Sequence, residues 1–159
     1  MERLLQNDDG RARSAVGTVF EHLSLEEITP LLPAIVESVE VPSPSGVMFA
    51  SGIRLSGLEL LARHRIAEGL ELCIEVTEID QWGKKDRIQR CLGTLASYGG
   101  AARPVLPELR QLKEDLEGHR EARSLGAQIE LCAETIAAIE AAPPGEPLRT
   151  LASLGASGR

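Results

Sequence analysis

Glutamates recur at helical spacing in a segment without basic side chains. Residues 66–81 contain no Lys or Arg, and their acidic residues are Glu68, Glu71, Glu75, Glu78 and Asp80. Residues three and four apart share one face of a helix, where like charges repel by about 0.2–0.5 kcal/mol per pair. A basic ligand would relieve this repulsion, so the face is a candidate binding surface. The alternative is that glutamate, a good helix former, faces water on a nearly buried helix.

Aromatic and basic side chains gather directly after that segment. The short run that begins there contains the chain's only tryptophan, Trp82, followed by Lys84, Lys85 and Arg87. Trp and Arg are enriched at contact hot spots, so an exposed Trp82 beside these cations would suit a protein contact or a stacking surface. Alternatively, Trp82 packs over a junction between repeats, Asp86 caps the next helix, and the lysines are solvated.

Histidines give no metal-ligand pattern. His22 and His64 end equivalent sequence patterns, and a polar ring at that position is expected to cap the last carbonyls of a helix. His119 falls in a turn next to Gly118. The absence of HxxxH or HxxE spacing leaves no support for a metal site.

Nucleophilic chemistry has little support either. The cysteines lie among aliphatic residues outside any CxxC pair, which predicts buried free thiols at Cys73, Cys91 and Cys132. Only Cys91, near the basic run, has the electropositive surroundings that a reactive thiol needs. The chain contains no GxSxG, P-loop or GxGxxG motif. We therefore expect no enzyme, no catalytic residue, no cofactor and no metal.

The composition narrows the classes of protein to consider. The 159 residues correspond to one domain, and aromatic residues make up only 3% of them, so the core must be aliphatic. A net charge of −7 argues against a general binder of nucleic acid or anionic membranes. No apolar run approaches the ~18–20 residues of a membrane span, and no signal peptide or lipidation motif is evident. A cytoplasmic protein is expected, unless the chain is a fragment of a larger secreted one.

Apolar periodicity predicts the elements that position these residues. It favours an all-α chain with helices at roughly 11–22, 25–39, 48–64, 66–80, 86–98, 102–117 and 121–141. We expect residues 1–142 to form a single domain. The run from Pro143 to Pro147 contains three prolines and a glycine, which predicts a linker or mobile tail over 143–159.

The helices also repeat. One pattern occurs three times in the first helix of a pair, 42 and then 34 residues apart, as VxxVFxH from Val16, LxxLAxH from Leu58 and LxxLAxY from Leu92. Second helices repeat as PLLPAI from Pro30 and PVLPEL from Pro104. Proline in the first turn of a helix costs no hydrogen bond, so these prolines are expected to start helices.

A two-helix unit of this length with a Pro-started second helix resembles the HEAT-like repeats, including those of the phycobilisome-lyase type, over about residues 1–117. The stretch Asp9-x-x-x-Arg13-x-Ala15 looks like the first-helix signature of that family. The pair at 48–80 departs from the pattern, because it has no Pro-containing start. More loosely, the chain is similar to HEAT-like segments of large bacterial multidomain proteins, which would make it a fragment.

The resemblance implies a HEAT-like α-α superhelix of about three helix pairs plus a C-terminal capping helix. Apolar stripes at 105–116 and 125–139 would face each other, and the helical hairpin they form would close the superhelix. Second helices line the concave face in such solenoids. Glu37, Glu40 and the glutamates of 66–81 would then lie side by side in an acidic groove, whereas a DNA-binding HEAT-like enzyme would show a basic face.

These observations favour a non-enzymatic interaction or scaffolding module. Its expected partner is a basic protein or peptide, neither nucleic acid nor membrane, bound to a groove whose carboxylates are already ordered. The expected binding residues are Glu37, Glu40, Glu68, Glu71, Glu75 and Glu78, with Trp82, Lys84, Lys85 and Arg87 at the rim. One alternative is a structural spacer within a larger protein. The other is a helical enzyme subunit that holds an anion at residues 82–90.

Overall fold

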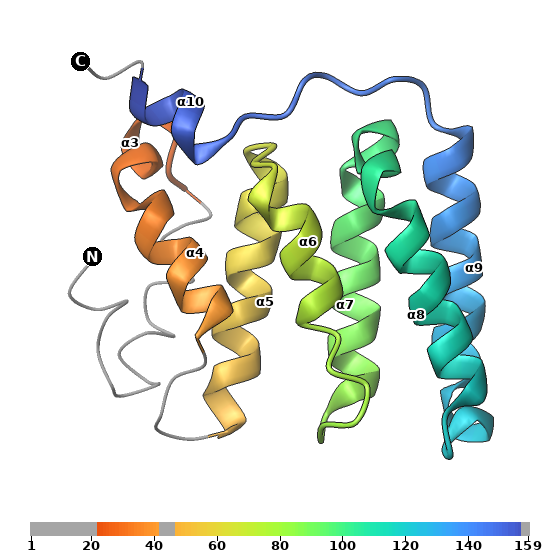
Figure 1. The fold of residues 1–159 in the computed structure, drawn as a ribbon. Coiled ribbons are helices and arrows are strands. Elements are labelled where there is room, and N and C mark those ends of the chain that lie inside the picture. Colours follow the sequence, from red (N-terminus) through yellow and green to blue (C-terminus); the bar gives the residue numbers. More distant parts are fainter. Residues whose placement is uncertain (1–21, 42–46, 157–159) are drawn as a thin grey trace. The chain divides into compact units, whose positions relative to one another are not determined.

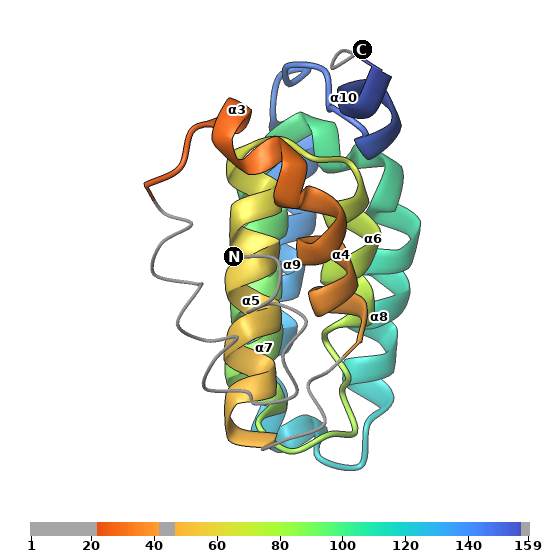
Figure 2. The same ribbon diagram turned by 90° about the vertical axis from the view of Figure 1, so that its left-hand side faces the viewer.

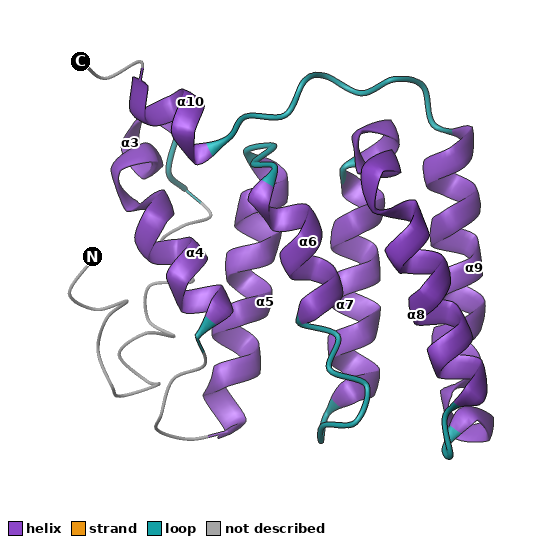
Figure 3. Cartoon of the chain, in the orientation of Figure 1, coloured by secondary structure: helices purple, strands orange, loops and turns teal. Residues whose placement is uncertain are grey.

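The computed structural model describes residues 22–41 and 47–156, and over these ranges the chain is all-α (Figure 3). Within them no strand forms, and the single extended pairing is an isolated bridge between Ile66 and Arg149. No helix of these ranges is long and apolar enough to cross a membrane. The chain divides into two compact units, one comprising residues up to 72 together with those from 149 onward, and the other comprising residues 73–148.

The described part of the first unit starts with short helical elements. Helix α3 (Leu25–Ile28) starts at a capping box, in which the Ser24 hydroxyl accepts from the Glu27 N–H and the Glu27 carboxylate accepts from the Ser24 N–H. A 3₁₀ turn (Thr29–Leu31) leads into α4 (Leu32–Glu40), and α5 (Val47–Arg63) follows. The predicted helix at 25–39 is therefore present but interrupted.

Helix α4 packs against α5 (Figure 2). Gly57 permits this close approach, because a Cβ atom there would lie 2.6 Å from Cγ2 of Val39. Arg54 is buried and donates from Nε to the Val39 carbonyl at 2.7 Å, which satisfies an acceptor in the last turn of α4. The core of this unit is aliphatic, as predicted, and includes Ile28, Leu32, Ile35, Leu55, Leu58 and Leu61.

Helix α6 (Glu68–Glu75) is shorter than the predicted helix at 66–80. The Thr77 hydroxyl donates to the Ile74 carbonyl at 2.7 Å, and Glu78 takes a positive φ of 40°. This left-handed conformation is rare for a residue with a side chain and ends helical propagation. Residues 76–83 consequently form an irregular loop.

The second unit is built on α7 (Lys84–Ser97), α8 (Leu106–Gly118) and α9 (Gly126–Ala141). Helix α9 packs against both α7 and α8 (Figure 1). The Cys132 thiol lies 3.5 Å from the Leu109 carbonyl, so the predicted facing of the stripes at 105–116 and 125–139 is confirmed. The buried side chains at this contact are Leu109, Leu112, Leu116, Leu125, Cys132 and Ile139.

The predicted tail divides into two parts. Pro143, Pro144 and Pro147 are exposed. Residues Leu151–Ala156 instead form helix α10, which belongs to the first unit. The predicted helix at 11–22 and the first-helix signature before it lie outside the described residues, apart from His22.

Candidate functional site

The irregular loop after α6 is held by a buried arginine. Arg87 lies in the first turn of α7 and is only 3% exposed. Its Nε donates to the Thr77 carbonyl at 3.1 Å, Nη2 donates to the Glu78 carbonyl at 2.8 Å, and Nη1 donates to the Trp82 carbonyl at 3.0 Å. The Glu78 carboxylate lies 3.6 Å from Nε. One guanidinium thus donates hydrogen bonds to three carbonyls that have no partner in helical or sheet pairing.

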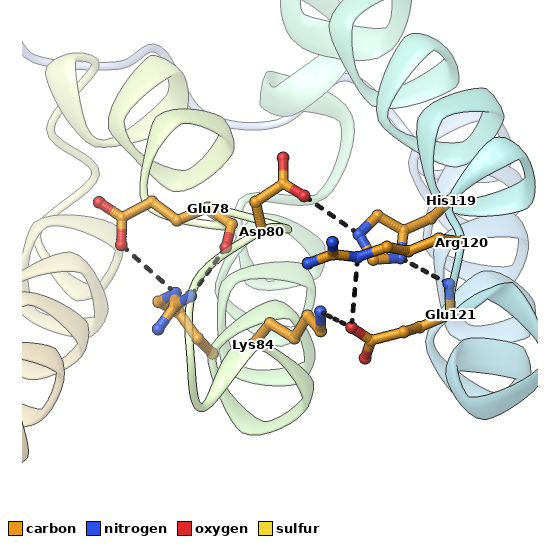
Figure 4. A network of polar contacts seen from close by, with 7 residues as sticks. Glu78, Asp80, Lys84, His119, Arg120 and Glu121 are labelled. Atoms are coloured by element: carbon orange, nitrogen blue, oxygen red, sulfur yellow. Dashed lines mark hydrogen bonds and ion pairs between the residues drawn. The ribbon is translucent and has the colours of Figure 1, made fainter.

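The same loop is joined to the turn between α8 and α9 (Figure 4). The His119 side chain is 6% exposed, and its Nε2 lies 3.2 Å from Oδ1 of Asp80. The Glu121 N–H donates to Nδ1 of His119 at 3.0 Å. Nδ1 therefore carries no proton, and Nε2–H is the donor to Asp80.

An ion pair joins the start of α7 to the same turn between α8 and α9. The Lys84 ammonium, 11% exposed, lies 3.1 Å from the Glu121 carboxylate and lowers the pKa of that carboxyl. Arg120 approaches the same carboxylate at 3.8 Å (Figure 4). Lys84 is therefore committed to an internal ion pair, whereas Lys85 is exposed on the next position of α7.

An open groove of about 600 Å³ lies between this loop and α8. The apolar residues that line it are Ile74, Ile79 and Leu112. Every charged residue of its lining is acidic: Glu78, Asp80, Glu108 and Asp115. An apolar floor with an acidic rim suits a cationic side chain, whose aliphatic stem packs on the floor while its charge meets the carboxylates.

Trp82 lines a second hollow of about 530 Å³, which shares Asp80 and Gln81 with the groove. The residue is 80% exposed, although its carbonyl accepts a hydrogen bond from Arg87. The predicted alternative, in which Trp82 packs over a junction and Asp86 caps the helix, does not describe this loop. Gly83 is the N-cap residue of α7, with φ of 76° and no side-chain cap. An exposed tryptophan on a fixed backbone has the properties of a contact anchor.

The six glutamates predicted to bind a partner lie on several elements. Of that set only Glu78 lines the groove. Glu37 and Glu40 are exposed on α4, and Glu71 and Glu75 are exposed on α6. Glu68 is half-buried and accepts the Leu151 N–H at 2.8 Å.

The rim residues are also divided. Trp82 and Lys85 are exposed, Lys84 is paired with Glu121, and Arg87 is buried as a structural donor. A basic run does not by itself reveal which arginine is buried. The spacing does contain that information, because Arg87, Cys91 and Leu95 follow one another at intervals of four on the buried face of α7.

The groove contains carboxylates that sequence reasoning did not select. Glu108 and Asp115 lie seven residues apart on α8, and Asp115 accepts a hydrogen bond from Gln111 at 2.9 Å. Spacing of seven places them on one helix face, which was the available signal. Their meeting with Asp80 depends on the loop conformation that Arg87 holds, and nothing in the sequence pattern predicts that.

His64 and the three cysteines lie at partly or fully buried positions. Burial, followed by the charges of Arg63 and Arg149, lowers the pKa of His64, and its Nε2 is buried without a hydrogen-bond partner. Over the residues described, no group of His, Cys, Asp and Glu could hold a metal ion. Cys73, Cys91 and Cys132 are all buried. Burial raises the pKa of Cys132 to about 11 and that of Cys73 well above its usual range, which keeps both thiols protonated.

Comparison of the chain with protein-family models, with curated proteins and with solved structures gives no match in any of the three.

Proposed function

We propose that this chain is a non-enzymatic interaction module that binds a basic segment of a partner protein in the groove between the 76–83 loop and α8. The observation that carries the proposal is the lining of the groove, whose charged residues are all carboxylates above an apolar floor. Two of these carboxylates already have internal partners, since Glu78 faces Arg87 and Asp80 faces His119. Glu108 and Asp115 on α8 are therefore the main residues expected to meet a ligand's charge.

The rigidity of the loop supports the same proposal. A groove whose wall is held by Arg87, His119 and Lys84 need not be ordered when a ligand binds, so little conformational entropy is lost on association. Exposed Trp82 adds an aromatic surface at the edge, on which an arginine of the ligand can stack. The site differs from the acidic face predicted along residues 68–78, although it serves the same class of partner.

We further propose that the module is a HEAT-like solenoid segment. Support comes from equivalent positions 74 residues apart. Leu32 and Leu106 are the first residues of α4 and α8. Ile28 and Ala102 are buried in the segments that directly precede these two helices. Each of these helices follows a 3₁₀ turn and carries a proline at its second position. Contact of α9 with both α7 and α8 is the packing expected where one helix pair stacks on the next.

The test is a titration of the chain with a fluorescein-labelled hexalysine peptide, followed by fluorescence anisotropy. Changing Glu108→Gln and Asp115→Asn together removes two rim charges. Since an exposed ion pair contributes about 0.2–1 kcal/mol, the affinity should fall roughly 2- to 30-fold. The matched control, Glu71→Gln with Glu75→Gln, removes the same charge from α6 and should change the affinity less than twofold.

Raising the salt concentration from 50 to 200 mM should weaken binding to the unaltered chain, because the Debye length shortens. Equal losses in the α8 and α6 variants would show that only net charge is sensed, and would remove the groove from the proposal. A spacer that binds nothing would give no saturable signal at low salt.

A further inference from the structure

The turn between α5 and α6 receives the C-terminal segment of the chain. Arg65 has a positive φ of 56°, which turns the backbone out of the helical path. Its carbonyl accepts from the Arg149 N–H at 2.9 Å, and the Ala67 N–H donates to the Arg149 carbonyl at 2.8 Å. This pair of bonds is the parallel bridge between Ile66 and Arg149. Backbone groups that the turn withdraws from helical pairing are thereby satisfied by an extended segment.

Side chains complete the contact. Glu68 accepts the Leu151 N–H at 2.8 Å, and the Arg149 guanidinium donates to the His64 carbonyl at 3.2 Å. Leu151 and Leu154 are half-buried on the docked helix. The α5–α6 turn therefore recognises Arg149 in an extended conformation, the backbone N–H of Leu151 and the leucines at 151 and 154.

The docked segment is held weakly. Helix α10 is only six residues long, and helices shorter than about 12 residues are marginal without tertiary contacts. The preceding stretch from Pro143 to Pro147 is exposed. Two polar atoms at the receiving turn, Oε2 of Glu68 and Nε2 of His64, are buried without a hydrogen-bond partner. Docking thus leaves polar groups unsatisfied, which lowers the cost of releasing the segment.

We propose that the α5–α6 turn is a docking site for an extended segment, that residues 148–154 occupy it within one chain, and that a second copy of the chain supplies the same residues when they are released. A second copy is the favoured occupant because its segment has the sequence seen in the site. An exposed, proline-rich connection is the element over which identical chains exchange segments at low cost. This inference is independent of the groove.

The test uses full-length chains and a fluorescein-labelled peptide of residues 147–156. Arg149→Pro removes the N–H that bonds to Arg65, which releases the segment and opens the turn. The peptide should bind the Arg149→Pro chain at least tenfold more tightly than the wild-type chain, whose own segment competes at the millimolar effective concentration of a tethered ligand. Equal affinity for both chains, or no binding to the variant, would overturn the proposal.

A second variant guards against a folding defect. Leu151→Pro removes the N–H that Glu68 accepts, yet proline suits the first position of a helix. It should also increase peptide binding over wild type. Adding Glu68→Ala to Arg149→Pro should weaken the peptide severalfold, while Glu71→Ala, on the exposed side of α6, should leave it unchanged.

The second copy is tested by mixing two full chains. Arg149→Pro accepts a segment but cannot donate one, and Glu68→Ala donates a segment but accepts one poorly. Light scattering should detect a heterodimer in the equimolar mixture and a smaller dimer fraction in either variant alone. A peptide that binds while the mixture stays monomeric at peptide-saturating concentrations would refute exchange between copies.

Discussion

Replacing Arg87 by methionine should destabilise the protein and loosen the loop that forms one wall of the groove. The substitution removes hydrogen bonds to the carbonyls of Thr77, Glu78 and Trp82 while keeping a long apolar side chain in the buried position. A bond to a charged donor contributes about 1.5–3 kcal/mol. The bond to the Thr77 carbonyl is buried, so its full contribution to stability is lost. The bonds to the other two carbonyls are part-buried, and these acceptors regain some hydration.

Taking half the value for each part-buried bond gives a total loss of about 3–6 kcal/mol. Urea unfolding followed by circular dichroism measures this loss directly. Arg87→Lys should retain less than half of the stabilisation, because an ammonium cannot reproduce the planar fork that reaches three carbonyls. Lys85→Ala, an exposed position of the same helix turn, is the control and should stay within about 0.5 kcal/mol of wild type.

The loop can be observed separately. Trp82 is the only tryptophan of the chain, so its fluorescence reports the 76–83 loop alone. Arg87→Met should lower its steady-state anisotropy in the folded protein and weaken hexalysine binding, whereas Lys85→Ala should do neither. A methionine variant with wild-type stability and unchanged anisotropy would refute the view that the guanidinium holds the loop.

Two further predictions concern the remaining elements. Because the pKa of His64 is lowered, the unfolded state binds more protons than the folded state below about pH 6.5. The stability that neutral His64 contributes is therefore complete above that pH and is lost as the pH falls towards the lowered pKa. Urea midpoints at pH 7.5 and 5.5 should differ more for wild type than for His64→Gln. Gly100→Ala should cost about 1–3 kcal/mol of overpacking, since a Cβ there would overlap the Pro143 carbonyl oxygen. Gly93→Ala meets no atom within 4 Å and should instead stabilise α7 by about 0.5–1 kcal/mol. Thermal unfolding of the two glycine variants compares them directly, and shifts of the same sign would contradict the packing described.

Much of the fold could be predicted because helical periodicity is a local property. The stripes that meet between α8 and α9 follow directly from spacing. The helix starts were predicted less closely, because Pro30 and Pro104 lie in the 3₁₀ turns that precede α4 and α8. The early end of α6 could not be predicted, because it depends on a left-handed Glu78 that a distant side chain stabilises. Local propensity favours a longer helix there, and tertiary hydrogen bonds override it.

The candidate site was harder to predict than the helices. Acidic character was evident from the run of glutamates, but a groove requires an apolar floor and two walls, and these come from residues some 30 positions apart. The docking of Arg149 on the α5–α6 turn left no trace in the pattern either, since backbone atoms make the bridge. Pairing between backbone atoms leaves no pattern in the order of the side chains, so periodicity and composition cannot predict the bridge.

Both proposed surfaces depend on backbone that leaves helical geometry at a non-glycine residue with positive φ, Glu78 in one case and Arg65 in the other. This backbone conformation costs of order 1–3 kcal/mol, which interactions in the surrounding structure must offset. At Glu78 the offsetting interactions lie within the loop and α7, because Arg87 donates to the loop carbonyls whether or not a ligand is present. At Arg65 the carbonyl is served by Arg149 of the C-terminal segment, so release of that segment leaves the strain in place and removes a hydrogen bond. The groove should therefore be constant in shape, whereas the α5–α6 turn should favour rapid recapture of a segment, either its own or that of a second chain.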